Sequence, residues 1–155
     1  MAAIARRTAL AGLLFAAVSA CVRGDEAAEL RERLMQVANA VSAGNPSEAI
    51  SVFSKSYKHY DKLRDYFSAL SNGLRVENEV DFLDDPSEEP EPEMNVRWSI
   101  TIADAEMHYS VQRAAEIKIR FARESKKWKI VDFEPIDLFD PSQQQPAQTT
   151  SHSSL

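Results

Sequence analysis

Cysteine, histidine and glycine are scarce in this chain. Of its 155 residues one is cysteine, three are histidine and four are glycine. A single cysteine excludes an intramolecular disulfide and a zinc site made of four cysteines. No HxH or HxxH spacing occurs and no glycine-rich phosphate loop is present, so the sequence predicts no metal and no cofactor.

Positive charge and long apolar runs are scarce as well. The formal net charge is −6, which is the wrong sign for a nucleic-acid-binding protein, whose affinity depends largely on cationic contacts to phosphate. Beyond the first 21 residues no apolar run approaches the ~20 residues that a transmembrane helix needs. With 44 % apolar residues the chain has the composition of an ordinary globular domain.

The N-terminus has the anatomy of a signal peptide. A basic segment with Arg6 and Arg7 precedes an almost unbroken apolar run over residues 9–20, which ends at Cys21. About 12 helical residues span roughly 18 Å, well short of the ~30 Å hydrocarbon core, so this run is too short to serve as a permanent anchor. The paired arginines leave twin-arginine export open as the route. Without residues 1–21 the chain carries 16 basic and 24 acidic side chains, a charge of −8.

The four residues Val18, Ser19, Ala20 and Cys21 resemble the bacterial lipobox. This resemblance implies that the chain is cut before Cys21 and that the cysteine receives acyl chains such as palmitate, two or three of which anchor a protein stably. It also implies a location in the bacterial cell envelope, and Val22 favours the outer membrane, facing the periplasm. Two alternatives stay open: an ordinary secretory signal with an incidental cysteine, and the N-terminal helix of a cytosolic protein.

Three helices are predicted after the signal. The first covers residues 25–43, where apolar side chains recur at spacings of three and four, and it stops at a glycine. Asn45 and Pro46 then form the N-cap and the first helical residue of a second helix that runs to about residue 53. The third helix covers residues 60–71 and is closed by an Asn-Gly dipeptide.

Four strands follow, because from residue 74 onward the apolar spacing changes from helical to alternating. The six acids and three prolines of residues 84–93 predict an exposed loop, and the polar segment 141–155 predicts a disordered tail. Three N-terminal helices and a four-stranded antiparallel meander predict an α+β domain over residues 22–140. The predicted strands are 74–82, 96–102, 115–121 and 128–133.

The run KWKIVDFEP at residues 127–135, which follows three helices and a meander, resembles the last strand of the NTF2-like superfamily. The resemblance implies a curved sheet that wraps around the three helices as a cone with an internal cavity. It also implies that the outer sheet face can form a homodimer, for which an exposed Val131 and Phe133 would be suited. Trp128 and Ile130 lie on the opposite face of the predicted strand from Val131 and Phe133, so one of these two pairs must face away from the interior of the cone.

Five residues are candidates for a pocket inside such a cone. Asn78 is the one polar residue on the apolar face of the first strand, and Trp98 lies on the apolar face of the second. Tyr57 and Tyr60 each join an apolar ring to a polar tip, which suits a pocket mouth. Asp132 would be a general acid or base if burial raised its pKa. For each of these residues ordinary core packing or an internal hydrogen bond is the alternative.

The ketosteroid isomerases and scytalone dehydratases of this superfamily place an Asp or a His inside the cone. Here His59 lies at a helix boundary and His108 lies between strands, where solvated positions are expected. We therefore expect a non-enzymatic domain that binds a small apolar ligand or an envelope protein and no nucleic acid. The alternative is a pocket enzyme of isomerase or dehydratase type that uses Asp104 or Asp132.

Overall fold

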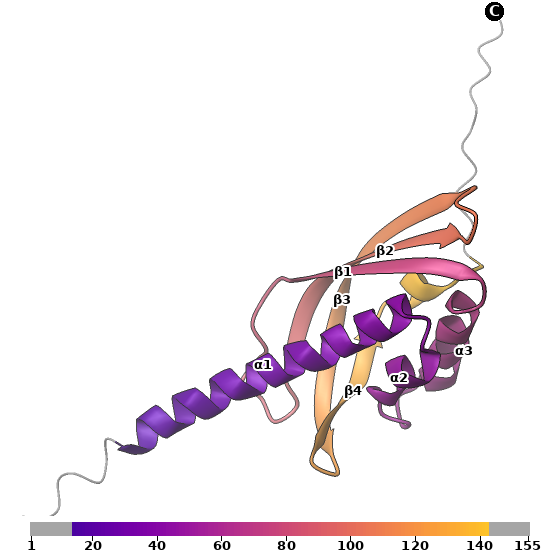
Figure 1. The fold of residues 1–155 in the computed structure, drawn as a ribbon. Helices are drawn as coiled ribbons and strands as arrows, with labels where there is room; N and C mark the ends of the chain where they lie inside the picture. Colours follow the sequence, from indigo (N-terminus) through magenta and orange to yellow (C-terminus); the bar gives the residue numbers. More distant parts are fainter. Residues whose placement is uncertain (1–13, 143–155) are drawn as a thin grey trace, which may run out of the picture.

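The chain folds as three helices followed by one antiparallel sheet (Figure 1). The computed structural model describes the backbone of residues 14–142 and the side chains of residues 24–142. The strand order is β1-β2-β3-β4, a simple meander, so the predicted α+β class with a four-stranded antiparallel sheet is confirmed. The elements are α1 Leu14–Ser42, α2 Pro46–Ser51, α3 Tyr60–Leu70, β1 Leu74–Phe82, β2 Glu93–Asp104, β3 Ser110–Glu124, β4 Lys127–Glu134 and the 3₁₀ turn η1 Asp137–Phe139.

The first helix ends at Ser42, one residue before the predicted end, but begins earlier than predicted. Gly44 adopts a φ of +70° after α1, a backbone conformation that favours glycine. Asn45 then caps α2, since its Oδ1 accepts a hydrogen bond from the backbone N–H of Glu48 at 3.3 Å. The predicted start at residue 25 is wrong, because α1 begins at Leu14. Residues 14–23 include three alanines, a residue type that favours helix, and contain no proline that would stop it.

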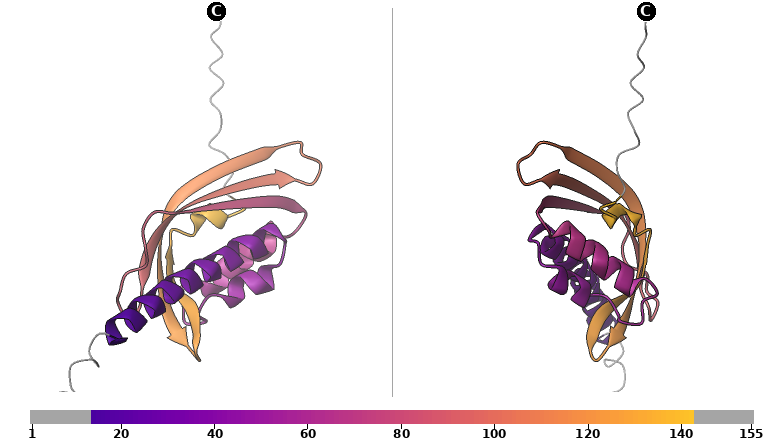
Figure 2. Two further views of the ribbon diagram at one scale, coloured as in Figure 1. Left: turned by 60° about the vertical axis from the view of Figure 1, so that its left-hand side comes forward. Right: turned by 90° about the vertical axis from the view of Figure 1, so that its right-hand side faces the viewer.

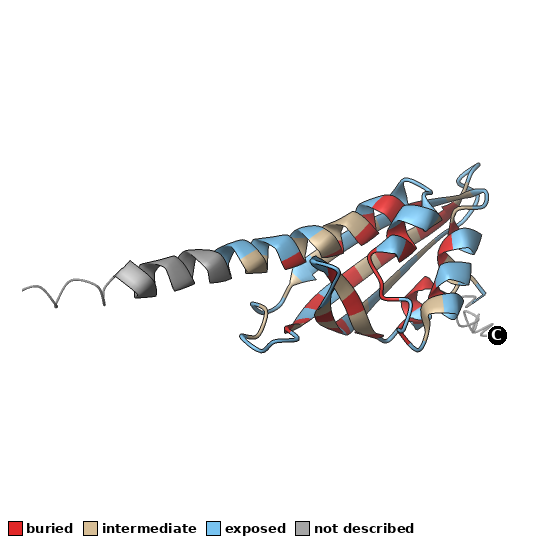
Figure 3. Cartoon of the chain, turned by 90° about the horizontal axis from the view of Figure 1, so that it is seen from below, coloured by how far each residue is buried: buried red, intermediate tan, exposed pale blue. Residues whose placement is uncertain are grey.

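The three helices lie on one side of the curved sheet, which arches over them (Figure 2). In α3 the residues Leu63, Phe67 and Leu70 share one face of the helix and are buried. Helices and sheet turn their buried positions toward one another and their exposed positions outward (Figure 3). The core therefore lies between the helices and the concave face of the sheet.

The β3–β4 hairpin contains a bulge that determines which side chains of β4 enter the core. Arg120 pairs with Asp132 while the next residue of β3, Phe121, pairs with Ile130, so Val131 is an extra residue in the ladder. Because of this extra residue Ile130 and Phe133 both face the core, and both are fully buried. The expectation of an exposed Phe133 at a dimer face is therefore wrong.

The segment after β4 closes the core, which the sequence-based prediction did not include. Pro135 ends the strand, and η1 then turns Leu138 and Phe139 inward, where both are buried. The guanidinium of Arg113 on β3 donates from Nη1 to the backbone oxygens of Asp140 at 2.6 Å and of Leu138 at 3.4 Å. These hydrogen bonds hold the C-terminal segment across the concave side of the sheet.

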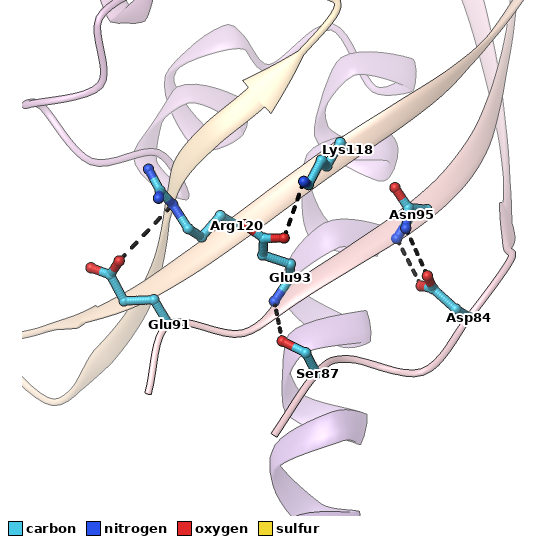
Figure 4. Close-up of polar contacts among 7 residues, drawn as sticks. All are labelled: Asp84, Ser87, Glu91, Glu93, Asn95, Lys118 and Arg120. Carbon is cyan, nitrogen blue, oxygen red and sulfur yellow. Dashed lines mark hydrogen bonds and ion pairs between the residues drawn. The ribbon is translucent and has the colours of Figure 1, made fainter. Parts of the chain in front are cut away.

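The acidic loop between β1 and β2 is tied to its neighbours by hydrogen bonds (Figure 4). Both carboxylate oxygens of Asp84 accept from Asn95, from the backbone N–H at 2.8 Å and from Nδ2 at 2.7 Å. Ser87 Oγ accepts from the backbone N–H of Glu93 at 2.9 Å. Most of the loop is exposed, as predicted. Asp85 forms an ion pair with Arg31, so this loop lies against α1.

Candidate functional site

The interior of the fold is filled by aromatic side chains. Trp98, Phe133, Phe67 and Phe139 are each at most 2 % exposed. The ring of Phe139 lies 5.3 Å from that of Phe67 and 5.3 Å from that of Trp98, both edge-to-face. Phe133 lies 5.8 Å from Trp98 and 5.9 Å from Phe139. We call these four residues the aromatic cluster, and their rings occupy the concave side of the sheet where the sequence predicts a pocket.

Asn78 is engaged within the protein. Its Oδ1 accepts from Trp98 Nε1 at 2.9 Å, and its Nδ2 donates to Ser42 Oγ at 2.9 Å and to the backbone oxygen of Ala38 at 3.2 Å. The amide thus links β1 and β2 to the last turns of α1. Both amide protons and one oxygen lone pair already form hydrogen bonds within the protein. This matches the alternative given for Asn78 in the sequence analysis, an internal hydrogen bond in place of a pocket role.

Tyr57 is 4 % exposed, and its hydroxyl donates to the backbone oxygen of Phe133 at 2.6 Å. Burial raises the pKa of Tyr57 above its usual value of 10.0, and the nearby carboxylates of Asp132 and Glu134 raise it further. The phenol is therefore neutral at physiological pH and acts as a hydrogen-bond donor. It connects the segment before α3 to the last strand.

Asp132 is half-buried beside this tyrosine, and its Oδ1 accepts from the backbone N–H of Phe133 at 3.1 Å. The bulge places Asp132 opposite Arg120, whose neighbours in β3 face the core, so Asp132 belongs to the other face of the sheet. His108 is exposed and lies 3.3 Å from the carboxylates of Asp104 and Glu106. His59 stands at the N-cap of α3, with its ring against that of Tyr57.

The five predicted pocket residues do not converge on one site. Asn78 and Trp98 are hydrogen-bonded to each other, and Tyr57 lies near Asp132, but Tyr60 belongs to a separate hollow. That hollow lies between α2, the segment that leads to α3, and the β3–β4 hairpin, and it measures about 530 Å³. We call it the α2 groove. Its lining residues are Ser47, Ile50, Ser51, Phe53, Ser54, Lys55, Ser56, Tyr60, Glu124 and Lys129.

Backbone pairing assembles the α2 groove. Phe53 and Ile130 form a parallel bridge, in which Ser54 N donates to the backbone oxygen of Ile130 at 2.8 Å and Ile130 N donates to that of Val52 at 2.9 Å. This bridge brings the segment after α2 onto the free edge of β4. Lys129, the residue before Ile130, is therefore brought beside α2, and its ammonium donates to the backbone oxygen of Ser51.

The polar side chains of the α2 groove form a short network. Ser54 is 2 % exposed, and its Oγ donates to Glu124 Oε1 at 2.5 Å and lies 2.8 Å from Ser56 Oγ. The pKa of Lys129 is lowered, first by partial burial and then by the positive charges of Arg33 and Lys127. The sequence analysis did not find this site, because its residues come from segments about 70 residues apart.

A second hollow of about 420 Å³ lies between α1 and the acidic loop. Its lining includes Glu26, Asp85, Glu88 and Glu89. Even so, no group of three or more Asp, Glu, His or Cys side chains in the described part of the chain is placed to hold a metal ion. Of the helices within residues 14–142, none is both long enough and apolar enough to cross a membrane.

Comparison with known proteins identifies the fold and nothing finer. No protein-family model matches the chain, and no curated protein matches it. Solved structures do match, among them an NTF2-like superfamily protein from Salmonella enterica serovar Typhimurium. That protein has a TM-score of 0.53 and 10 % identity, over 88 % of this chain and 99 % of the other.

Two further solved structures have the same architecture. A ketosteroid isomerase-like protein from Erwinia carotovora has a TM-score of 0.55 and 9 % identity, over 70 % of this chain and 92 % of the other. A conserved protein from Planctomyces limnophilus has a TM-score of 0.59 and 13 % identity, over 71 % and 93 %. At such identities the likeness shows the fold alone.

Proposed function

We propose that this NTF2-like chain is a lipid-anchored protein of the bacterial cell envelope whose domain acts by binding rather than by catalysis. The observation that carries the binding role is the aromatic cluster, which occupies the concave side of the sheet. The polar groups that border it, Asn78 and the Tyr57 hydroxyl, form hydrogen bonds within the protein. Binding is therefore expected on the outside of the domain.

The alternative, a pocket enzyme of isomerase or dehydratase type, needs a proton-transferring side chain inside the cone. Apart from aromatic residues, the one buried polar or charged residue among residues 24–142 is Ser54, and the hydroxyl of the buried Tyr57 donates to the backbone oxygen of Phe133. The two carboxylates considered for this role, Asp104 and Asp132, are both half-buried. Neither carboxylate is therefore enclosed in the core. These observations favour the binding role.

The anchor is proposed from the lipobox that ends at Cys21. Contacts between α1 and the rest of the domain begin close to that residue, since Glu26 lies 3.5 Å from the guanidinium of Arg123 and Leu30 is 1 % exposed. Five helical residues from Cys21 to Glu26 span about 7.5 Å. An acylated Cys21 would therefore hold the domain directly at the membrane surface, and the partner or ligand would be met there.

Intact-mass analysis of the protein purified from its host tests the anchor. We expect a chain that starts at Cys21 and carries two or three acyl groups, recovered with the membrane fraction. The matched variant Cys21→Ser should keep the uncleaved N-terminus, carry no acyl group and incorporate no labelled palmitate. A mature chain that starts at another residue or lacks acyl groups would overturn the lipid anchor.

Native mass spectrometry of the same preparation, released from detergent, tests the binding role. We expect a bound small molecule or an envelope protein, in a complex that persists in Asp132→Asn. The enzyme alternative predicts instead a turnover with a bell-shaped pH profile that Asp132→Asn or Asp104→Asn abolishes. Such a profile would replace the binding role.

A further inference from the structure

The α2 groove carries positive charge in an otherwise acidic protein. Lys55 and Lys129 line the groove, and the charges of Arg33 and Lys127 are close enough to lower the pKa of Lys129. The one acidic residue of the lining is Glu124, and one of its oxygens accepts from Ser54. The groove is therefore locally cationic although the whole chain has a net charge of −6.

The lysines of the groove form no salt bridge within the described part of the chain, whereas two other lysines of the domain do. Lys58 forms an ion pair with Glu134, and Lys118 lies 3.2 Å from Glu93. Within the described residues Lys55, Lys127 and Lys129 form no ion pair with a carboxylate. Lys129 uses one of its three N–H donors, toward the backbone oxygen of Ser51, and keeps two. Glu124 is the one carboxylate of the lining and its charge acts on Lys129, but it faces several cations, so an anion that binds between Lys55 and Lys129 would be stabilised by the remaining positive charge.

The rest of the lining adds a loop fixed by internal hydrogen bonds and an apolar wall. Ser56 is exposed beside Lys55, and its backbone N–H and Oγ already point to Ser54 Oγ, which fixes the loop. Ile50 and Tyr60 supply apolar surface on the side of the helices. A volume of about 530 Å³ lies within the range of small-molecule sites, roughly 300–1,000 Å³.

We propose that the α2 groove binds a small amphiphilic anion, with a phosphoryl or carboxylate head between Lys55 and Lys129 and an apolar body against Ile50 and Tyr60. This inference rests on the proposed binding role and names its ligand class. The head would accept hydrogen bonds from the two free donors of Lys129 and from the ammonium of Lys55. Charge-assisted hydrogen bonds of this kind are about twice as strong as neutral ones.

Titration of the full chain in dodecyl maltoside with phenyl phosphate tests the site. We expect saturable heat by calorimetry, and amide shifts by NMR confined to α2, residues 52–60 and the β3–β4 hairpin. Benzyl alcohol, which lacks the charge, should bind at least tenfold more weakly. Shifts confined to another surface, or equal affinity for the two probes, would overturn the proposal.

Charge-removing variants supply the second arm of the test. Lys129→Gln and Lys55→Gln should each raise the Kd of phenyl phosphate about tenfold, which is the value of one charge-assisted hydrogen bond. Lys55 is exposed and forms no ion pair with a carboxylate of the described residues, so its variant separates binding from folding. Lys62→Gln on α3, where Lys62 lies over the ring of Tyr66, is the matched control and should leave the Kd unchanged. Equal losses in all three variants would contradict the site.

The anionic head could come from a soluble molecule or from a lipid, and nanodiscs distinguish these sources. If discs of phosphatidylglycerol shift the same amides and discs of phosphatidylcholine do not, the ligand is a lipid of the membrane. If phenyl phosphate alone shifts them, the ligand is soluble. If neither does while native mass spectrometry still finds a bound molecule or protein, the anion site is wrong and the proposed binding role stands.

Discussion

The indole N–H of Trp98 on β2 donates to the side-chain oxygen of Asn78 on β1 at 2.9 Å, although the two residues are not partners in the ladder. Asn78 pairs with Ile100, and Trp98 pairs with Val80, so the bond runs diagonally across the strands. The same amide reaches Ser42 and the backbone of α1 through its nitrogen. The side chain of Asn78 thus fixes the position of α1 over the sheet and supplies the hydrogen-bond acceptor that the buried indole N–H of Trp98 needs.

The first prediction concerns this amide. Asn78→Ala would leave the fully buried indole N–H of Trp98 without a partner and would release Ser42, so we expect a loss of about 2–3 kcal/mol in the free energy of unfolding. Urea unfolding followed by tryptophan fluorescence measures it. Glu79→Ala, at the next and exposed position of β1, is the control and should change stability little. Equal stability of the two variants would show that the amide is not needed.

The second prediction concerns the C-terminal turn. Phe139 packs against the three other members of the aromatic cluster, Phe67, Trp98 and Phe133. Phe139→Ala should cost about 3–5 kcal/mol, because it leaves a cavity among rings that other elements hold in place. Phe139→Leu, which refills most of that volume, should cost less than half as much. Similar losses in both variants would mean that the cavity does not set the cost.

Strand β1 could be predicted to its end residues, whereas β3 could not. In β1 every second residue is apolar apart from Asn78, so the alternation marks the whole strand. β3 begins at Ser110, five residues before the predicted start. The prediction missed these residues because Arg113 occupies an inward position, where an apolar residue is expected. An inward arginine breaks the apolar pattern, and its role depends on the oxygens of Leu138 and Asp140, which are distant in sequence.

The α2 groove and the bulge in the β3–β4 hairpin could not be predicted from the pattern of apolar and polar residues. A bulge adds one residue to a strand without a distinctive residue type, so the parity of Val131 and Phe133 could not be read correctly. The bridge between Phe53 and Ile130, together with the pairing of β3 and β4, brings Ser54 beside Glu124 and Lys129 beside Ser51. The local pattern of residues predicts helices and strands, whereas a site such as the α2 groove depends on how distant helices and strands pack together.

The third prediction concerns the exposed ion pair of Lys58 and Glu134. Lys58, through a hydrogen bond and its charge, lowers the pKa of Glu134, and Glu134 raises the pKa of Lys58 in return. The contribution to stability should be present at neutral pH, vanish as the pH falls through the lowered pKa of Glu134, and vanish at alkaline pH above the raised pKa of Lys58.

Because both side chains are exposed, the effect should be small and sensitive to salt. Thermal unfolding of Glu134→Gln should give a slightly lower midpoint than the unsubstituted protein at pH 7. The two midpoints should coincide at pH 2 and in 1 M salt. A difference that persists at pH 2 would have to arise from packing instead of charge.

The fourth prediction concerns the buried phenol of Tyr57. Its pKa is raised by burial and by Asp132 and Glu134, so the folded state holds the proton after an unfolded chain, with a tyrosine pKa near 10, has lost it. The stability that this neutral phenol contributes is complete below about pH 10. As the pH rises from there toward the raised pKa, it should fall by up to about 1.4 kcal/mol per pH unit.

Urea unfolding between pH 8 and pH 11 tests this dependence by comparing variants that differ in one hydroxyl. Tyr57→Phe should be less stable at pH 8 by about 1–2 kcal/mol, because the hydrogen bond to the Phe133 oxygen is lost, and should then decline less steeply with pH than the unsubstituted protein. Tyr109→Phe removes a hydroxyl from a side chain that is 52 % exposed and should keep the full decline. If Tyr57→Phe declines as steeply as Tyr109→Phe, other groups destabilise the fold at alkaline pH, and the phenol of Tyr57 ionises as freely as in the unfolded chain.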